Sequence, residues 1–300
     1  MALISVKLRA LSATVATAML LVGLPVRPAA ADYISSELGD AGSWTVLGIG
    51  TDGRVTMTGG SVVGNVGVAG GRFTFTDGAI TGGVAVGAGV TVTRTGGSLT
   101  EGIKTGIDLS SDVSAATSAS NAFAVLATTQ NVSGNRINGT TTINAANPGG
   151  RNVIDLSEVI LTGQVLTLNG PPGSEFVLND SGAMRLTSSE IVLTGGLTAN
   201  DVVFNDTGTR GVTMTGGVLD GIILAPDASV RVTSGLVNGE IIGGDRITLN
   251  SGQVVETPAA PAPVLGTGLP AFALVGGCLL LARLLRRRAA GGQPMVAAGP

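Results

Sequence analysis

The chain has 300 residues, 44% of them hydrophobic and only 12% charged, so it is too apolar for a disordered protein and long enough to bury a large core. It contains no histidine and a single cysteine, Cys278, which excludes disulfides within the chain and zinc sites built from these residue types. All 20 acidic residues lie between Asp32 and Glu256 beside only ten basic residues, and this net charge of −10 argues against nucleic acid as a partner.

The N-terminal segment, 1–31, is predicted to be a secretory signal peptide. Two basic residues are followed by an apolar run over positions 10–24, which is short for a membrane helix. Ala29 and Ala31 are the small residues of a cleavage site. We therefore expect export of the protein and cleavage after Ala31.

The segment 32–256 contains strand-like blocks that recur at a nearly fixed interval. The sequence Val-Thr-Met-Thr-Gly-Gly begins at Val55 and again at Val212, and a related block follows each copy at the same interval. A similar interval separates Leu166 from Met184. Apolar residues alternate with threonine, which indicates strands with one buried face, and glycines mark the corners. The predicted fold is all-β, a β-solenoid with about 18 residues per coil and three short faces.

The pattern changes between positions 108 and 129, where glycines are absent and alanine and serine dominate. Apolar residues recur there at steps of three, four or seven, which predicts one α-helix with an apolar face. Ser110 or Ser111 is expected to cap its start. We expect the helix to lie along one face of the solenoid and to cover several coils. The apolar face consists of Leu109, Val113, Ala116, Phe123 and Leu126.

The outward threonines of the blocks are the candidate binding residues. Stacked Thr-x-Thr pairs would present flat ranks of methyl and hydroxyl groups, a surface suited to ordering water and docking on ice. The alternative is that threonine is simply a favourable exposed strand residue. Arg185 and Arg231 interrupt the pattern, and Arg94 occupies an inward position, which indicates a terminal coil or a slipped register. The candidates are Thr56, Thr58, Thr74, Thr76, Thr93, Thr95, Thr213 and Thr215.

The acidic residues favour structural roles over catalysis. Asp155, Glu158, Asp201 and Asp206 are scattered singly, mostly at turn-like positions, and do not form the paired carboxylates that polysaccharide hydrolysis requires. We therefore predict no catalytic residue and no cofactor, and no residue is singled out as a metal ligand, although calcium binding stays open.

The aromatic residues do not predict a sugar-stacking platform. Phe73, Phe75, Phe176 and Phe204 fall at inward or apolar strand positions, so we expect them in the core. A broad sheet face remains able to bind a polymer through hydrogen bonds, but no residue is singled out for it.

The C-terminal region divides into a Pro/Ala linker (257–263), a segment predicted to cross a membrane (264–288) and a short tail (289–300). Pro261, Pro263 and the cluster Arg286, Arg287 and Arg288 resemble the PEP-CTERM sorting signal of Gram-negative bacteria, with Ala262 where that signal has glutamate. The resemblance implies an exosortase-type processing enzyme as a partner. Processing of the tail and simple membrane anchoring both stay open.

Short motifs in the body occur at residues 38–47, 64–68, 176–178, 200–204, 221–228 and 237–239. Through these motifs the body resembles the ice-binding-like domain and its bacterial relative, the choice-of-anchor A domain. In these families a first β block is followed by a helix and a longer β block. The resemblance implies discontinuous coils, with the N-terminal block beside the C-terminal end.

Together these observations predict a non-catalytic exported protein that displays a β-solenoid for adhesion or for structural association with exopolysaccharide. Ice binding through the Thr-x-Thr face is the alternative, and a polysaccharide-degrading enzyme is a third reading. The expected location is the cell surface, membrane-anchored or secreted into the extracellular matrix of a Gram-negative bacterium. Expected partners are extracellular polysaccharide, another cell surface or ice, and the membrane through the C-terminal segment, with no nucleic acid.

Overall fold

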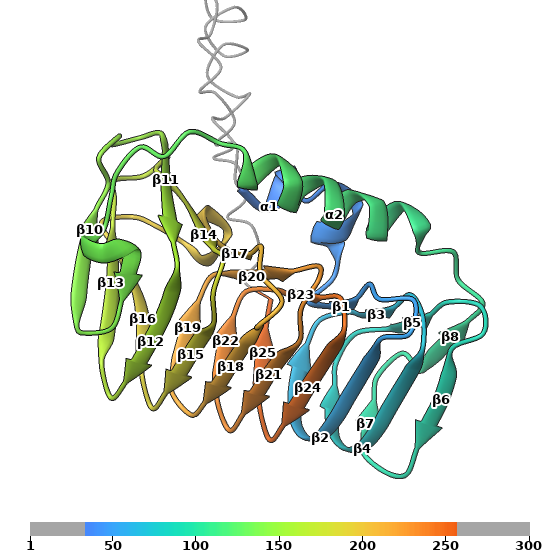
Figure 1. The fold of residues 1–300 in the computed structure, drawn as a ribbon. Helices are drawn as coiled ribbons and strands as arrows, with labels where there is room; N and C mark the ends of the chain where they lie inside the picture. Colours follow the sequence, from blue (N-terminus) through green and yellow to red (C-terminus); the bar gives the residue numbers. More distant parts are fainter. Residues whose placement is uncertain (1–33, 257–300) are drawn as a thin grey trace, which may run out of the picture. The chain divides into compact units, whose positions relative to one another are not determined.

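The computed structural model describes residues 34–256, which form a stack of parallel strands with a long helix along one side (Figure 1). Each complete coil contributes a strand to each of three faces, here named a, b and c. Face a is a nine-stranded sheet, whereas faces b and c belong to one larger sheet because two long strands bend across both. The predicted solenoid-like, parallel β architecture is therefore confirmed.

The strands are distributed over the faces as follows. Face a contains β1 (Val46–Gly48), β3 (Val66–Val68), β5 (Val84–Val86), β8 (Ile103–Thr105), β11 (Arg151–Leu156), β14 (Glu175–Asp180), β17 (Val202–Asp206), β20 (Ile222–Ala225) and β23 (Ile241–Gly243). Face b contains β6 (Thr91–Arg94), β9 (Arg136–Ile137), β12 (Glu158–Thr162), β15 (Met184–Thr187), β18 (Val212–Thr215), β21 (Val230–Thr233) and β24 (Arg246–Asn250). Face c contains β7 (Ser98–Leu99), β10 (Thr141–Asn144), β13 (Val165–Asn169), β16 (Glu190–Thr194), β19 (Val218–Asp220), β22 (Leu236–Asn238) and β25 (Gln253–Val255). The bending strands are β2 (Arg54–Val63) and β4 (Arg72–Ile80).

The coils do not stack in chain order. Strand β2 lies between β24, from the end of the described chain, and β4, from its beginning. On face a, β1 likewise lies between β23 and β3. Figure 1 shows this junction as blue strands beside orange ones. The discontinuous order implied by the resemblance is thus present.

The coil length is less regular than the sequence suggested. Met184 pairs with Val159 in the preceding coil and with Val212 in the following one, and both steps are longer than the predicted repeat. The proposed step from Leu166 to Met184 is wrong, because Leu166 lies on face c and pairs with Ile191. The extra residues lie in the turns between strands, including 170–174 and 207–211. The apolar alternation identifies the strands but does not record these insertions.

Two apolar cores hold the fold together. The first fills the interior of the coils with inward residues of all three faces, such as Val55, Met57 and Val212. The second lies outside face a, where Val203 and Leu224 pack beneath the helix. The strands of face a that contribute to this second core therefore carry apolar residues on both sides, the pattern expected where a helix covers a parallel sheet.

Helix α2 (Ser110–Ala124) lies along face a and contacts β14, β17 and β20, as expected (Figure 1). It is shorter than predicted, because the chain turns at Val125 and Leu126, after which the Thr129 N–H donates to the Val153 carbonyl over 2.9 Å. The capping prediction is wrong: the Oδ1 of Asp108 accepts from the Ser110 N–H over 3.0 Å, and no serine side chain caps the helix.

Buried amides align α2 with face a. The Nδ2 of Asn205 donates to the Oδ1 of Asn179 (2.9 Å) and to the Ser120 carbonyl (3.1 Å). The Nδ2 of Asn179 donates to the Phe123 carbonyl over 2.9 Å. These bonds satisfy polar groups between the sheet and the helix and fix the helix position along the coils.

Short helices complete the described chain: α1 (Ile34–Glu37) and the 3-10 turns η1 (Gly39–Ser43), η2 (Ser133–Asn135) and η3 (Ala199–Asp201). Within residues 34–256, no helix combines the length and apolar character needed to cross a membrane. The predicted signal peptide with Ala29 and Ala31 lies outside the described residues. The linker, membrane segment and tail, with Pro261, Pro263, Arg286, Arg287 and Arg288, also lie outside them.

Candidate binding face

Face b is the candidate functional surface, because its strands present alternate side chains outward in two aligned ranks. The first rank runs across adjacent strands through Arg185, Thr213, Arg231, Thr248, Thr56, Thr74 and Thr93. The second rank runs through Thr162, Thr187, Thr215, Thr233, Asn250 and Thr58. Neighbours within a rank are separated by about 4.8 Å, the spacing of paired strands.

Six of the eight predicted threonines belong to these ranks. Thr56, Thr74 and Thr93 are consecutive in the first rank, and Thr213 stands apart between Arg185 and Arg231. Thr58 and Thr215 belong to the second rank.

Thr76 and Thr95 do not join the second rank. A register shift after Phe75 places Asp77 opposite Thr58, so Thr76 is bulged out of the pairing. Thr95 follows the end of β6, although its N–H still donates to the Phe75 carbonyl over 3.0 Å. Both threonines are exposed at the edge of face b.

Other threonines were missed by sequence reasoning. Thr248, Thr162, Thr187 and Thr233 occupy the same ranks as the predicted residues. The Val-Thr alternation marks them as outward, but their alignment with the N-terminal coils depends on the β24–β2 junction. The first rank therefore has four consecutive threonines, Thr248 through Thr93, and is more continuous than the sequence indicated.

The end of the solenoid explains the unexpected position of Arg94. It pairs with Phe75 at an inward position, yet its side chain is exposed because no further coil covers it. Its guanidinium lies 5.9 Å from the Phe75 ring centre and donates to the Gly97 carbonyl over 2.7 Å. Arg94 thus covers the end of the core by a cation–π contact, and the terminal-coil interpretation holds.

The core prediction for the phenylalanines is confirmed. Phe73, Phe75, Phe176 and Phe204 are all buried, and the rings of Phe73 and Phe75 stack with centres 6.3 Å apart. None of these rings is available on face b for stacking on a sugar or a base.

The scattered acids serve the local structure. Asp201 forms a capping box with Thr198, and Glu158 forms an ion pair with Arg136. The Oδ1 of Asp155 accepts from the Asn179 amide over 3.2 Å. The Oδ1 of Asp206 accepts from the Gly208 N–H over 2.9 Å.

Four buried carboxyls have raised pKa values, and three of them, Asp180, Asp206 and Glu240, form no ion pair within residues 34–256. Burial raises the pKa of Asp206 to about 6 and also raises the pKa of Asp180, its partner on the adjacent strand. Burial, reinforced by Glu256, raises the pKa of Glu240 to about 9. One oxygen of each is enclosed and has no hydrogen-bond partner in the described structure. Because they are 2–4% exposed, these groups are placed to affect stability and not to meet a polymeric substrate.

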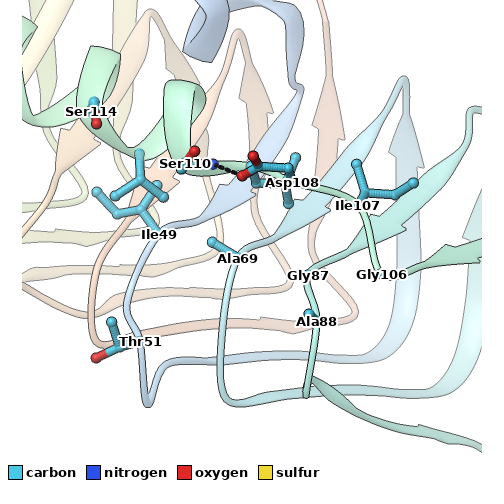
Figure 2. A pocket seen from close by; sticks show the side chains of 12 residues that line it. Ile49, Thr51, Ala69, Gly87, Ala88, Gly106, Ile107, Asp108, Ser110 and Ser114 are labelled. Atoms are coloured by element: carbon cyan, nitrogen blue, oxygen red, sulfur yellow. Dashed lines mark hydrogen bonds between the residues drawn. The ribbon is translucent and has the colours of Figure 1, made fainter.

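A shallow hollow of about 470 Å³ lies where α2 begins beside the turns of the N-terminal coils (Figure 2). Its wall consists mostly of small or apolar residues such as Ile49, Ala69 and Ala88, and its one charged side chain is Asp108. Hydrogen bonds from Ser110 lower the pKa of Asp108, so this carboxylate is engaged in capping the helix. No group of three metal-ligating side chains gathers anywhere in residues 34–256.

Comparison with solved structures shows the same fold in ice-binding proteins. The one from the Antarctic ascomycete Antarctomyces psychrotrophicus is 24% identical, with a TM-score of 0.52 over 74% of this chain and 98% of that one. The ice-binding protein_1 domain of Shewanella frigidimarina is 19% identical, with a TM-score of 0.54 over 74% and 98% of the two chains. An ice-binding protein of an Antarctic Flavobacteriaceae bacterium is 21% identical, with a TM-score of 0.56 over 76% of this chain but 48% of that one.

No curated protein matches the chain. A family model described as an ice-binding-like adhesive domain matches residues 34–255, which include every described strand. The match covers more than half of the chain and confirms the resemblance found in the body. The chain belongs to the family of ice-binding-like adhesive domains.

Proposed function

We propose that the protein is a non-catalytic exported adhesin whose solenoid is displayed at the cell surface or in the extracellular matrix, with face b as its contact surface. The observation that carries this proposal is the alignment of outward side chains into two ranks over consecutive parallel strands. Helix α2 covers face a, so face b stays open to a partner. Family membership supports an adhesive role.

The contact surface is tested with Thr74→Tyr, which places a bulky ring in the middle of the first rank. Thr167→Tyr is the matched control, because Thr167 is a partly exposed residue on face c. Binding of the full-length chain is measured on films of cellulose, polygalacturonate and extracellular polysaccharide from a Gram-negative biofilm. We expect binding to at least one film, weakened by the change on face b alone. Absence of binding to all films, or equal loss with both variants, contradicts the proposal.

Ice binding is the second candidate, and the consecutive threonines Thr248, Thr56, Thr74 and Thr93 favour it. The solved neighbours named as ice-binding proteins support it at the level of fold. Measurement of thermal hysteresis and ice recrystallisation decides between the candidates. Absence of both activities at micromolar protein excludes ice as the partner, and loss of activity in Thr74→Tyr assigns it to face b.

Export and anchoring form a separate part of the proposal. We expect the signal peptide to direct export and residues 257–300 to retain the protein at the membrane until an exosortase-type enzyme acts on the tail. Fractionation of cells expressing the chain with and without residues 257–300 tests this. Equal release of both forms contradicts membrane retention.

A further inference from the structure

Face b carries a row of three arginines that the threonine pattern does not include. Arg54 pairs with Arg246 on one side and with Arg72 on the other, so the three occupy the same register position on β24, β2 and β4. All three are exposed. They precede the inward residues Ile247, Val55 and Phe73, and the row therefore runs beside the first threonine rank.

The row has no counter-charge of its own. None of the ion pairs among residues 34–256 includes Arg54, Arg72 or Arg246. Asp52 and Asp245 lie in the preceding turns, and Asp245 accepts a hydrogen bond from Ser229 over 2.7 Å. Like charges on directly opposed strand positions destabilise a sheet. Three adjacent unpaired guanidinium groups are therefore a structural disadvantage that an anionic partner would remove.

The charge is segregated by face. Strands of face b, with β2 and β4, contain seven arginines and two acids, a net charge of +5. Strands of face a contain two basic and four acidic residues, and those of face c contain two acids, so each has a net charge of −2. Face b is thus the basic surface of an otherwise acidic body, and it would attract a polyanion to this side of the molecule.

We infer that face b binds a carboxylated extracellular polysaccharide, a polymer of uronic acids, through the row Arg54, Arg72 and Arg246. This inference rests on the proposed role of face b and names its ligand class. The planar guanidinium group matches a carboxylate with two parallel hydrogen bonds. The row repeats at about 4.8 Å, so it is suited to a linear chain that crosses the strands and presents its carboxylates in series.

The neighbouring residues favour a sugar over a nucleic acid. Thr248, Thr56 and Thr74 follow the row on the same strands and offer hydroxyl groups for hydrogen bonds with sugar hydroxyls. Single-stranded nucleic acid is usually held by bases stacked on aromatic rings. Phe73 and Phe75, on the same strand as Arg72, are fully buried.

The test compares two double variants of the full-length chain with the same loss of charge. R54Q/R72Q removes two members of the row. K104Q/R210Q removes two exposed charges elsewhere, because Lys104 lies on face a and Arg210 in the turn before β18. Affinity for polygalacturonate is measured by biolayer interferometry, with methyl-esterified polygalacturonate and dextran as uncharged references. We expect a loss of about tenfold or more for R54Q/R72Q, about twofold or less for K104Q/R210Q, and weak binding to both references.

Equal losses in the two variants would show a net-charge effect only and would overturn the inference. Equal affinity for single-stranded DNA of the same number of charges would overturn the assignment to a polysaccharide. Weakened polygalacturonate binding in Thr74→Tyr but not in R54Q/R72Q would refute the arginine row and leave face b as the contact surface. If neither R54Q/R72Q nor Thr74→Tyr weakened the binding of polygalacturonate, face b would not be the surface that binds this polymer, and the inference would be overturned.

Discussion

At the scale of single residues, the fold depends on corner glycines that the repeated sequence already marks. Gly217, the last residue of the second copy of the repeat, has φ +82° and lies where face b turns into face c. A Cβ there would lie 2.0 Å from the Ser189 carbonyl oxygen of the adjacent coil. In the first copy, a Cβ on Gly60 would likewise lie 1.9 Å from the Gly252 carbonyl oxygen. The repeated glycine thus reflects a requirement of the backbone.

Gly217→Ala is expected to destabilise the protein more than Gly89→Ala. Both glycines have φ near +80°, so each substitution incurs a backbone cost of about 1–2 kcal/mol. A Cβ on Gly89 meets no atom within 4 Å, whereas one on Gly217 forces adjacent backbone apart. Urea denaturation should show a further loss of at least about 2 kcal/mol for Gly217→Ala. If both variants lost the same free energy of unfolding, the backbone at Gly217 would be able to move aside without cost, and the prediction would be wrong.

The buried carboxyl of Glu240 predicts a dependence of stability on pH. Its pKa is about 9 in the folded chain and near 4.5 in the unfolded chain, so the folded state retains the proton between these values. Stability is therefore expected to fall as pH rises from about 5 to 9, by up to several kcal/mol. Glu240→Gln should reduce this decline, whereas the exposed Glu190→Gln should not. The decline is measured as the difference between the urea midpoints at pH 5 and pH 8.5. If Glu240→Gln shows the same decline as the wild-type chain, Glu240 is not its cause.

At the scale of elements, α2 is held by one large side chain and a few small ones. Phe123 is 1% exposed and packs in the core between the helix and face a, beside Ala116 and Ala119. The small residues allow the helix to approach the sheet closely. Phe123 therefore provides most of the apolar volume that α2 inserts into this core.

Phe123→Ala is expected to cost about 3–5 kcal/mol, because it leaves a cavity between the helix and the sheet. Val125→Ala is the control, since Val125 is 83% exposed and its truncation should change stability by less than about 0.5 kcal/mol. Chemical denaturation compares the two variants. A small cost for Phe123→Ala would show that α2 is only loosely attached to face a.

The elements also show how far sequence reasoning extends. The strands and their outward residues were predictable, because alternation with period two is a local pattern. The longer coils on either side of Met184 were not, because turn insertions leave the alternation unchanged. The arginine row had a visible local sign, an arginine directly before Val55, Phe73 and Ile247. That the three arginines form one row could not be predicted, because it depends on the tertiary contact that places β24 beside β2.

At the scale of the whole molecule, the N-terminal block, α2 and the C-terminal block are joined at several places. Strand β2 pairs with β24, β25 and β4, and the Nε1 of Trp44 donates to the Oδ1 of Asp112 on α2 over 2.7 Å. Trp44 is the only tryptophan in the chain, so its fluorescence reports on this connection.

We expect the two blocks to unfold together. Trp44 fluorescence and far-ultraviolet circular dichroism should then give the same urea midpoint for the wild-type chain. Independent unfolding would be possible only if the β24–β2 junction contributed little, as in repeat arrays with weak interfaces. Different urea midpoints for the two signals would show that the blocks unfold independently and would contradict the prediction.

The position of β2 also constrains when folding can finish. As the chain emerges from its N-terminus, β1 and β2 are free long before β23, β24 and β25, and in that interval one edge of each early strand has no partner. Unpaired strand edges are sites of mistaken association. The exposed edge closes only when residues near 255 have emerged, so a chain truncated before that point keeps an open edge at its first coil. Emergence of the last coil, and not the order of the coils along the chain, therefore sets the moment at which the fold closes.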